Sequence, residues 1–150
     1  MSSLSCSIPV SVLRATPFSL DWYDSVWAKL SATNEKGTSA ESAEGNNAIL
    51  MTRPDPPSNL IEETQYRTGY VLGLSWSPEA DNGSPIIDYT ISRAVGAGSF
   101  STLAVSSATN FIVFGLTPGV TYRFKVQARN SVGLSTASSE LSLLSAYVPT

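Results

Sequence analysis

Leu116-Thr117-Pro118-Gly119-Val120-Thr121-Tyr122-Arg123-Phe124-Lys125-Val126-Gln127-Ala128-Arg129-Asn130-Ser131-Val132-Gly133 is the stretch that decides the fold of this chain. From Tyr122 to Ala128 every second residue is apolar, and the residues between them are polar. This period of two predicts a β-strand with one face in a core and the other in water. Thr-Pro-Gly before the strand predicts a tight turn, because Pro118 presets the backbone for the first central position. The last four residues predict a second turn.

Six further short strands are expected around this one, all between residues 56 and 150. Together with 122–129, the expected ranges are 57–61, 71–78, 87–92, 100–105, 110–114 and 141–148. Within 87–92 we expect Ile87, Tyr89 and Ile91 to face inwards. Short strands in this number, separated by turn residues, predict a β-sandwich.

The motif Leu-x-Pro-Gly-x-x-Tyr-x-Phe-x-Val-x-Ala-x-Asn-x-x-Gly resembles the E–F corner and the F strand of a fibronectin type III domain. The resemblance covers nearly all of residues 56–150, and residues 81–86 resemble the family's B–C loop. It implies an all-β fold, an immunoglobulin-like (fibronectin type III) β-sandwich, with one complete domain over residues 58–150.

An internal repeat indicates a second, partial copy of the same fold. Ala32-x-Asn34-x-x-Gly37-x-Ser39-x-x-Ser42 recurs as Ala128-x-Asn130-x-x-Gly133-x-Ser135-x-x-Ser138, 96 residues later. This offset is close to the length of one sandwich domain of roughly 100 residues. Val26 falls where Tyr122 stands, so the first copy lacks the corner tyrosine. We therefore expect residues 1–53 to be a partial sandwich at the N-terminus, holding strands E, F and G.

Within this partial copy, extended segments are expected at residues 8–13, 25–34 and 48–51. The residues expected on the inward face of 25–34 are Val26, Ala28, Leu30 and Ala32. A half sandwich exposes a sheet edge and an apolar face, and it should not be stable alone. The missing strands would come from a neighbouring chain or from the preceding part of a longer polypeptide, and the sequence leaves both open.

Residues 54–57 are the expected linker between the two copies. Three of these four residues are proline, which favours a stiff, extended connection. The repeat offset places Arg53 and Pro54 on Pro149 and Thr150, so the end of the chain falls where a further linker would begin. Both ends are therefore expected to be cut from a longer array.

Composition excludes several classes of function. The net charge of −3 offers no basic surface for nucleic acid. Without histidine and with one cysteine, the chain lacks the commonest general base and cannot build a zinc site. No apolar run approaches the roughly 18 residues of a membrane helix. We expect no enzyme activity, no metal, no cofactor and no membrane insertion.

Asn82-Gly83-Ser84 is the one N-glycosylation sequon of the chain. In a secreted protein Asn82 would carry an N-linked glycan. The competing interpretation is a plain tight turn, since Asp-Asn-Gly is favoured there.

Cys6 and three aromatic residues are the other candidate site residues. Cys6 would form a disulfide with a partner outside this chain segment, or remain a small apolar residue with a free thiol. Trp22, Tyr23 and Trp27 are interface candidates, because exposed aromatic residues often mark contact surfaces. Trp27 is out of phase with the inward face and is expected to point outwards.

Together these patterns predict a structural or adhesive repeat protein, extracellular or at the cell surface. Repeats at fixed spacing with stiff linkers make rods, and a surface low in charge suits a packed or glycan-coated filament. The expected partners are copies of the chain itself, assembled head-to-tail by strand addition to the half domain.

Two other function classes remain open from the sequence. One is the ligand-binding ectodomain of a receptor, which would present residues 81–85 and 130–134. The other is a spacer in a hydrolase whose catalytic domain lies elsewhere. The family resemblance also allows a place inside cells, in muscle-type filaments.

Overall fold

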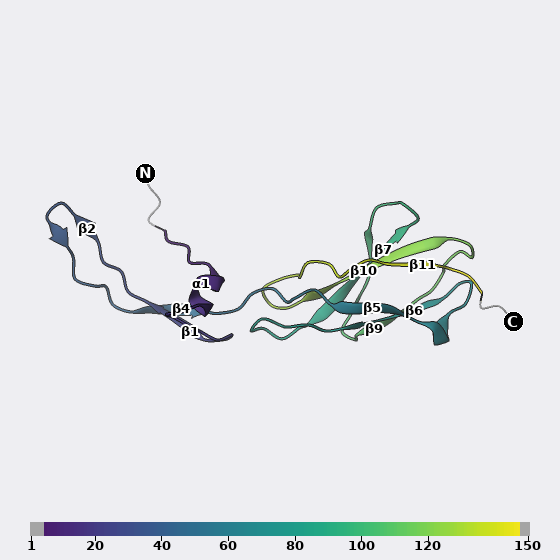
Figure 1. Ribbon diagram of the computed structural model, residues 1–150, viewed down its shortest axis with the longest axis horizontal. Helices are drawn as coiled ribbons and strands as arrows, with labels where there is room; N and C mark the ends of the chain where they lie inside the picture. The colour runs from purple at the N-terminus through teal and green to yellow at the C-terminus, as the bar shows by residue number, and fades with distance from the viewer. Residues whose placement is uncertain (1–4, 148–150) are drawn as a thin grey trace. The chain divides into compact units, whose positions relative to one another are not determined.

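The computed structural model describes residues 5–147, apart from the side chain of Asn47. The chain divides between Met51 and Thr52 into two compact units, here called the first unit and the second unit. Figure 1 traces both and labels most of their elements.

The second unit is the predicted sandwich of two antiparallel sheets. One sheet has the order β5–β6–β9, with β5 at Ser58–Glu63, β6 at Leu72–Ser77 and β9 at Asn110–Val113. The other has the order β11–β10–β7–β8, with bounds Leu141–Leu144, Thr121–Arg129, Asp88–Val95 and Ser101–Ser106. A single 3₁₀ turn, η1 at Thr64–Tyr66, follows β5. The all-β fold class is confirmed.

The core of the second unit lies between the two sheets and follows the period-two pattern. Along β10 the side chains of Tyr122, Phe124, Val126 and Ala128 are each at most 5% exposed. Leu72, Leu74 and Trp76 of β6 meet them from the facing sheet, and Tyr89 and Ile91 lie beside them on β7 of the same sheet; all five are buried. Alternation on both sheets thus builds one continuous apolar layer.

The prediction that Ile87 faces inwards was wrong, since its side chain is 52% exposed. β7 begins one residue later, at Asp88, so Ile87 stands outside the pleat that sets the alternation. Its N–H still donates to the carbonyl of Arg129, at 2.8 Å. Ile86 packs against the core instead.

The first unit contains a strand pair, a small hairpin and one short helix. β1 (Ser25–Ala28) pairs antiparallel with β4 (Gly45–Ile49), and β2 (Thr33–Asn34) pairs with β3 (Gly37–Thr38). The strand expected over 25–34 is therefore divided into β1 and β2. Among the described residues of the first unit only Leu50 is buried. This unit has no core of its own comparable to that of the second.

The prediction of an extended segment over residues 8–13 was wrong, because Val10–Arg14 form the helix α1. The carbonyl of Pro9 accepts the N–H groups of Val12 and Leu13, at 3.0 and 3.4 Å. Proline has a backbone suited to the start of a helix, and here it begins a single turn. The alternation of apolar residues had suggested a strand, but no strand of the described part of the chain lies beside this segment.

Candidate functional site

Ionisable side chains of the described residues pair with one another and do not converge on one place. Arg67 bonds Glu62 at 2.6 Å, Lys125 lies 3.6 Å from Glu140, and Arg129 makes a two-point contact with Asp88. The hydrogen bond and charge of Arg129 hold the pKa of Asp88 below its usual range. Burial raises the pKa of Tyr89. The Arg129–Asp88 pair joins β10 to β7, and the other two pairs tie β5 and β10 to residues outside the strands, which is a structural use of charge.

Metal and membrane sites are also absent from the described residues. No cluster of histidine, cysteine or carboxylate side chains in residues 5–147 could hold an ion. No helix in the same range has the length and hydropathy to cross a bilayer.

The internal repeat holds at the level of single hydrogen bonds. In the second unit Ser135 N–H donates to Ala128 O at 2.8 Å, and Ala128 N–H donates to Ser135 Oγ at 3.0 Å. In the first unit Ser39 N–H donates to Ala32 O at 2.8 Å, and Ala32 N–H donates to Ser39 Oγ at 3.0 Å. Each serine thus takes the place of a strand residue in both copies.

The second serine of the motif repeats this arrangement. Ser138 exchanges its N–H and Oγ with the backbone of Val126, at 2.8 and 3.0 Å. Ser42 does the same with Leu30, at 2.8 and 3.1 Å. The ion pair Lys125–Glu140 likewise has an equivalent 96 residues earlier, which is Lys29–Glu44. The first unit is therefore a structural copy of the β10–β11 part of the second.

The corner before the strand is copied too, although its tyrosine is missing. Tyr122 Oη accepts the N–H of Thr117 at 3.0 Å. At the equivalent place in the first unit, Asp24 Oδ2 accepts the N–H of Asp21 at 2.8 Å. The carboxylate of Asp24, three residues after Asp21, thus takes the role of the tyrosine hydroxyl. The alignment of the two repeats did not predict this replacement. Tyr23 has φ +74°, near the +81° of Gly119 that it matches.

The two copies differ in what covers them. Leu30 is 71% exposed, whereas Val126 at the matching position is fully buried. Ala28 and Ala32 are exposed, and Val26 is half-buried. We call these four residues the open face.

The strand edges differ in the same way. β10 pairs with β11 on one side and β7 on the other, but within the described first unit β1 pairs with β4 alone. One edge of β1 therefore lacks a partner strand among the described residues of this unit.

An apolar hollow of about 280 Å³ lies at the start of the open face. Its lining residues come from β1 and from the segment before it: Ile8, Leu13, Phe18, Leu20, Ser25, Val26, Trp27 and Ala28. The open face and this hollow together are the candidate interaction surface of the first unit.

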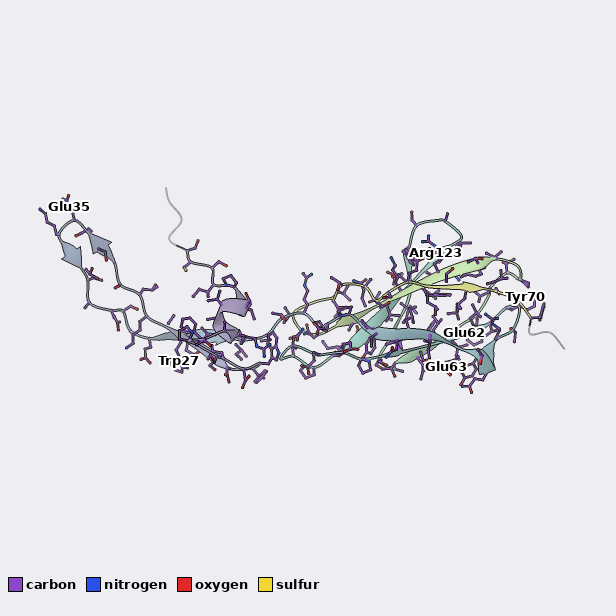
Figure 2. All side chains as sticks on the ribbon, viewed as in Figure 1. Trp27, Glu35, Glu62, Glu63, Tyr70 and Arg123 are labelled. Carbon is purple, nitrogen blue, oxygen red and sulfur yellow. The ribbon has the colours of Figure 1, made fainter. Side chains whose placement is uncertain are left out.

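The three predicted interface aromatics are not gathered into one platform. Trp22 is half-buried, with the guanidinium of Arg14 4.2 Å from its ring centroid. Tyr23 is 65% exposed and Trp27 is 62% exposed. Only Trp27 lines the hollow; Figure 2 labels it on β1 and labels Glu35 at the tip of the β2–β3 hairpin. An interface role for the three residues stays a prediction.

Cys6 is exposed and unpaired by any disulfide in the described chain. Asn82 has φ +54°, which fits a turn. Its side-chain nitrogen donates to Arg53 O at 2.9 Å and to Asp55 Oδ1 at 3.0 Å. A glycan would replace one of these N–H hydrogens, so the glycan and this pair of bonds compete. Both the disulfide and the glycan stay predictions.

The proline-rich segment, residues 52–57, begins the second unit, and two asparagines bond it to the loops of that unit. Besides the bonds of Asn82, the side-chain nitrogen of Asn130 donates to Thr52 O at 2.7 Å and to Asp81 O at 3.0 Å. Thr52 N–H in turn donates to Asn82 O at 3.0 Å. Asn130 is only 2% exposed. The stiffness of this segment thus has a source beyond proline, and the Asn in the repeated motif was the one sequence signal for it.

Comparison with known proteins gives a family match for the second unit. A family model of the fibronectin type III domain matches residues 55–143. Fibronectin type-III domain-containing protein 3A of Pongo abelii is 34% identical over 89 residues, which are 59% of this chain and 7% of that protein. The twitchin kinase region from C. elegans, a solved structure, superposes with a TM-score of 0.58 at 31% identity, covering 63% of this chain and 17% of that one.

One match reaches into the first unit. Protein sidekick-2 of Gallus gallus is 36% identical over 121 residues, which are 74% of this chain and 5% of that protein. A match of this length is longer than the second unit, so it includes part of residues 1–51. The chain spans less than a tenth of the length of either curated relative.

Proposed function

Since the chain belongs to the fibronectin type III family, we propose that it is a non-catalytic structural module of a repeat array, setting the distance and direction between neighbouring domains. The observation that carries this proposal is the bonding of residues 52–55 to the loops of the second unit by Asn82 and Asn130. A loose tether would swing freely, whereas this segment is held at three acceptor atoms, Thr52 O, Arg53 O and Asp55 Oδ1. Two further features support it, the repeat of about one domain length and the closed core without converging chemistry.

A force experiment on the full chain tests this function. With the chain held at its two ends, the second unit should resist load and then unfold in one step. The step should lengthen the chain by roughly 30 nm, since extended chain spans about 3.5 Å per residue. Asn130→Ala should loosen residues 52–55 before that step, and the matched variant Asn34→Ala should not. Smooth extension without a distinct unfolding step would exclude a load-bearing role.

The finer part of the proposal is a structural or adhesive role outside the cell, in a filament or surface array. The sequon at Asn82 and the exposed Cys6 support that location. Intact mass of the native protein, with electron microscopy of the same material, tests it. A glycan on Asn82 and regular filaments are expected, while an unmodified Asn82, a reduced Cys6 and single particles would place the module inside the cell.

A further inference from the structure

We propose that the open face of the first unit binds a polypeptide segment equivalent to residues 52–109 of the second unit, which adds a strand to the free edge of β1 and covers its apolar side chains. This inference rests on the proposed function as a structural repeat, and it names the partner of the first unit. The second unit supplies the template, because it contains the same strand pair with its cover in place.

One edge of β1, and of residues 29–32 that continue it, has no partner strand among the described residues of the first unit. The backbone of Leu30 and of Ala32 is bonded to Ser42 and Ser39, on the β4 side. The residues equivalent to Lys29 and Ser31 are Lys125 and Gln127, and these lie opposite Ser92 and Thr90 of β7. The first unit therefore presents a strand edge whose partner in the second unit is β7.

The second feature is the amide of Asn34, which matches Asn130. Asn34 Oδ1 accepts the N–H of Lys36 at 2.8 Å, as Asn130 Oδ1 accepts that of Val132 at 2.9 Å. In the second unit the amide nitrogen also donates to the carbonyls of Thr52 and Asp81. Among the described residues, the nitrogen of Asn34 has no acceptor. The bond of its Oδ1 thus orients the amide of Asn34, so that its nitrogen could donate to two carbonyls of the bound segment.

Glycine in the same hairpin gives an independent indication. Gly133 has φ +147°, and a Cβ built on it would lie 3.2 Å from Nε of Arg53, a residue of the proline-rich segment. Gly37 has φ +142°, and no described atom lies within 4 Å of the same point. The space that the segment before β5 fills in the second unit is therefore open in the first.

These features select a polypeptide over other occupants. A lipid or a small apolar ligand could cover Leu30, but it would not offer two carbonyls to Asn34 and a strand edge to β1. A second folded copy of the chain is also unsuited, because the strands that match are β6 and β7 of its second unit. Their side chains Leu72, Leu74 and Ile91 are fully buried in that copy's own core.

A chimera tests the inference with the chain's own sequence. Residues 52–109 are placed directly before Arg14, since Asn110 matches Arg14 in the repeat, and residues 14–150 follow unchanged. The amides of residues 28–34 should exchange roughly 100-fold or more slowly than in the natural chain. The same chimera carrying Leu30→Asp should lose this protection, because the carboxylate would lie in the new core. In the natural chain Leu30→Asp should leave exchange of these amides unchanged.

A second arm keeps the test decisive if the chimera does not fold. Isotope-labelled natural chain is mixed with the separate polypeptide of residues 52–109, and resonances of residues 26–34 are followed. Saturable shifts are expected, and Asn34→Ala should weaken binding by roughly 30-fold, the effect of two lost hydrogen bonds of about 1 kcal/mol each. Unprotected amides in the chimera together with no shifts in the mixture would overturn the inference. So would protection of residues 28–34 by the natural chain alone at high concentration, or by phosphatidylcholine vesicles.

The force experiment on the second unit fails or succeeds separately from these measurements. If that unit unfolds in one step but the open face takes no segment, the structural function stands and only the partner is wrong.

Discussion

The first and second units share a backbone pattern and differ in burial. The two serines of the motif make the same bonds in both, at distances that agree within about 0.1 Å for the Ser39 and Ser135 pairs. The asparagines share only the bond of Oδ1 to the N–H two residues later. Yet Leu30 is 71% exposed and its counterpart Val126 is fully buried. Local turns and side-chain bonds are therefore encoded within about 20 residues of sequence. Burial depends on strands that lie much further along the chain.

This difference implies unequal stability, because most of the free energy of folding comes from apolar burial. Two antiparallel strands alone are marginally stable in water. The second unit should therefore unfold cooperatively, and the first should exchange its amides quickly. Substitutions at matched positions of the repeat, or on the same face of the repeated strand, measure how much each bond or side chain gains from the core.

The largest contrast should come from the apolar face of the strand. Phe124→Ala should lower the free energy of unfolding of the second unit by roughly 3–5 kcal/mol, because it leaves a cavity in a closed core. Leu30→Ala should change stability by less than about 0.5 kcal/mol, since its side chain is mostly in water. Urea unfolding followed by amide exchange separates the two units. Equal effects would mean that the open face is covered in solution.

The next contrast lies in the two asparagines. Asn130→Ala should cost about 2 kcal/mol, because two buried carbonyl contacts and two accepted N–H bonds are lost together. Asn34→Ala removes one exposed turn bond and should cost less than about 0.5 kcal/mol. Thermal unfolding followed by near-ultraviolet circular dichroism gives the values. A large effect of Asn34→Ala in the natural chain would show that its amide is already bonded.

The corner gives a smaller difference. Tyr122→Phe should cost about 1 kcal/mol, because the N–H of Thr117 loses its acceptor while the ring stays buried. Asp24→Ala removes the acceptor of Asp21 N–H in an exposed turn, where water replaces it. Its effect should be too small to measure by urea unfolding. An effect of Asp24→Ala as large as that of Tyr122→Phe would mean that the first corner is buried.

Sequence patterns predicted the sandwich because its signals are local. The turn at Pro118–Gly119 and the alternation along 122–129 each lie within a few residues. The strand bounds agree with the expected ranges within about three residues, except that β11 ends at Leu144 while its expected range ran to residue 148, which lies outside the described residues. The error at Ile87 arose just before the first residue of a strand, where the alternation does not yet apply. The error at residues 8–13 arose because alternation predicts a strand only where a partner strand is present, and this segment has none among the described residues.

The bonds that hold residues 52–55 could not be predicted in the same way. Asn130 and Thr52 are 78 positions apart, and nothing in either segment states that they meet. The replacement of a corner tyrosine by Asp24 was also hidden, because a carboxylate and a phenol share no pattern except their oxygen. Contacts between distant loops can be identified only in the folded structure, although the asparagine shared by the two copies of the motif pointed to Asn130.

The smallest expected effect concerns charge at the end of the strand. Asp88 on β7 faces Arg129 on β10. In the first unit Thr33 matches Arg129, and its hydroxyl forms a hydrogen bond of 2.9 Å with the hydroxyl of Thr38, so no charge is involved there. Arg129 lowers the pKa of Asp88 in the folded state. As the pH falls below about 4, the unfolded chain takes up this proton first. The stabilisation is therefore complete above that pH and is lost as the pH falls through the folded pKa.

Urea midpoints of the second unit at pH 7, 4 and 2.5 measure this loss. Other carboxylates also titrate there, so the informative quantity is the difference between the natural chain and Asp88→Asn, which should be largest at pH 7 and shrink towards pH 2.5. Amide exchange at Thr33 should be the same in both proteins, because no ionisable group closes that hairpin end. A difference that stays constant with pH would assign the effect of Asp88 to packing, and the contrast in charge between the two strand ends would then carry no stability.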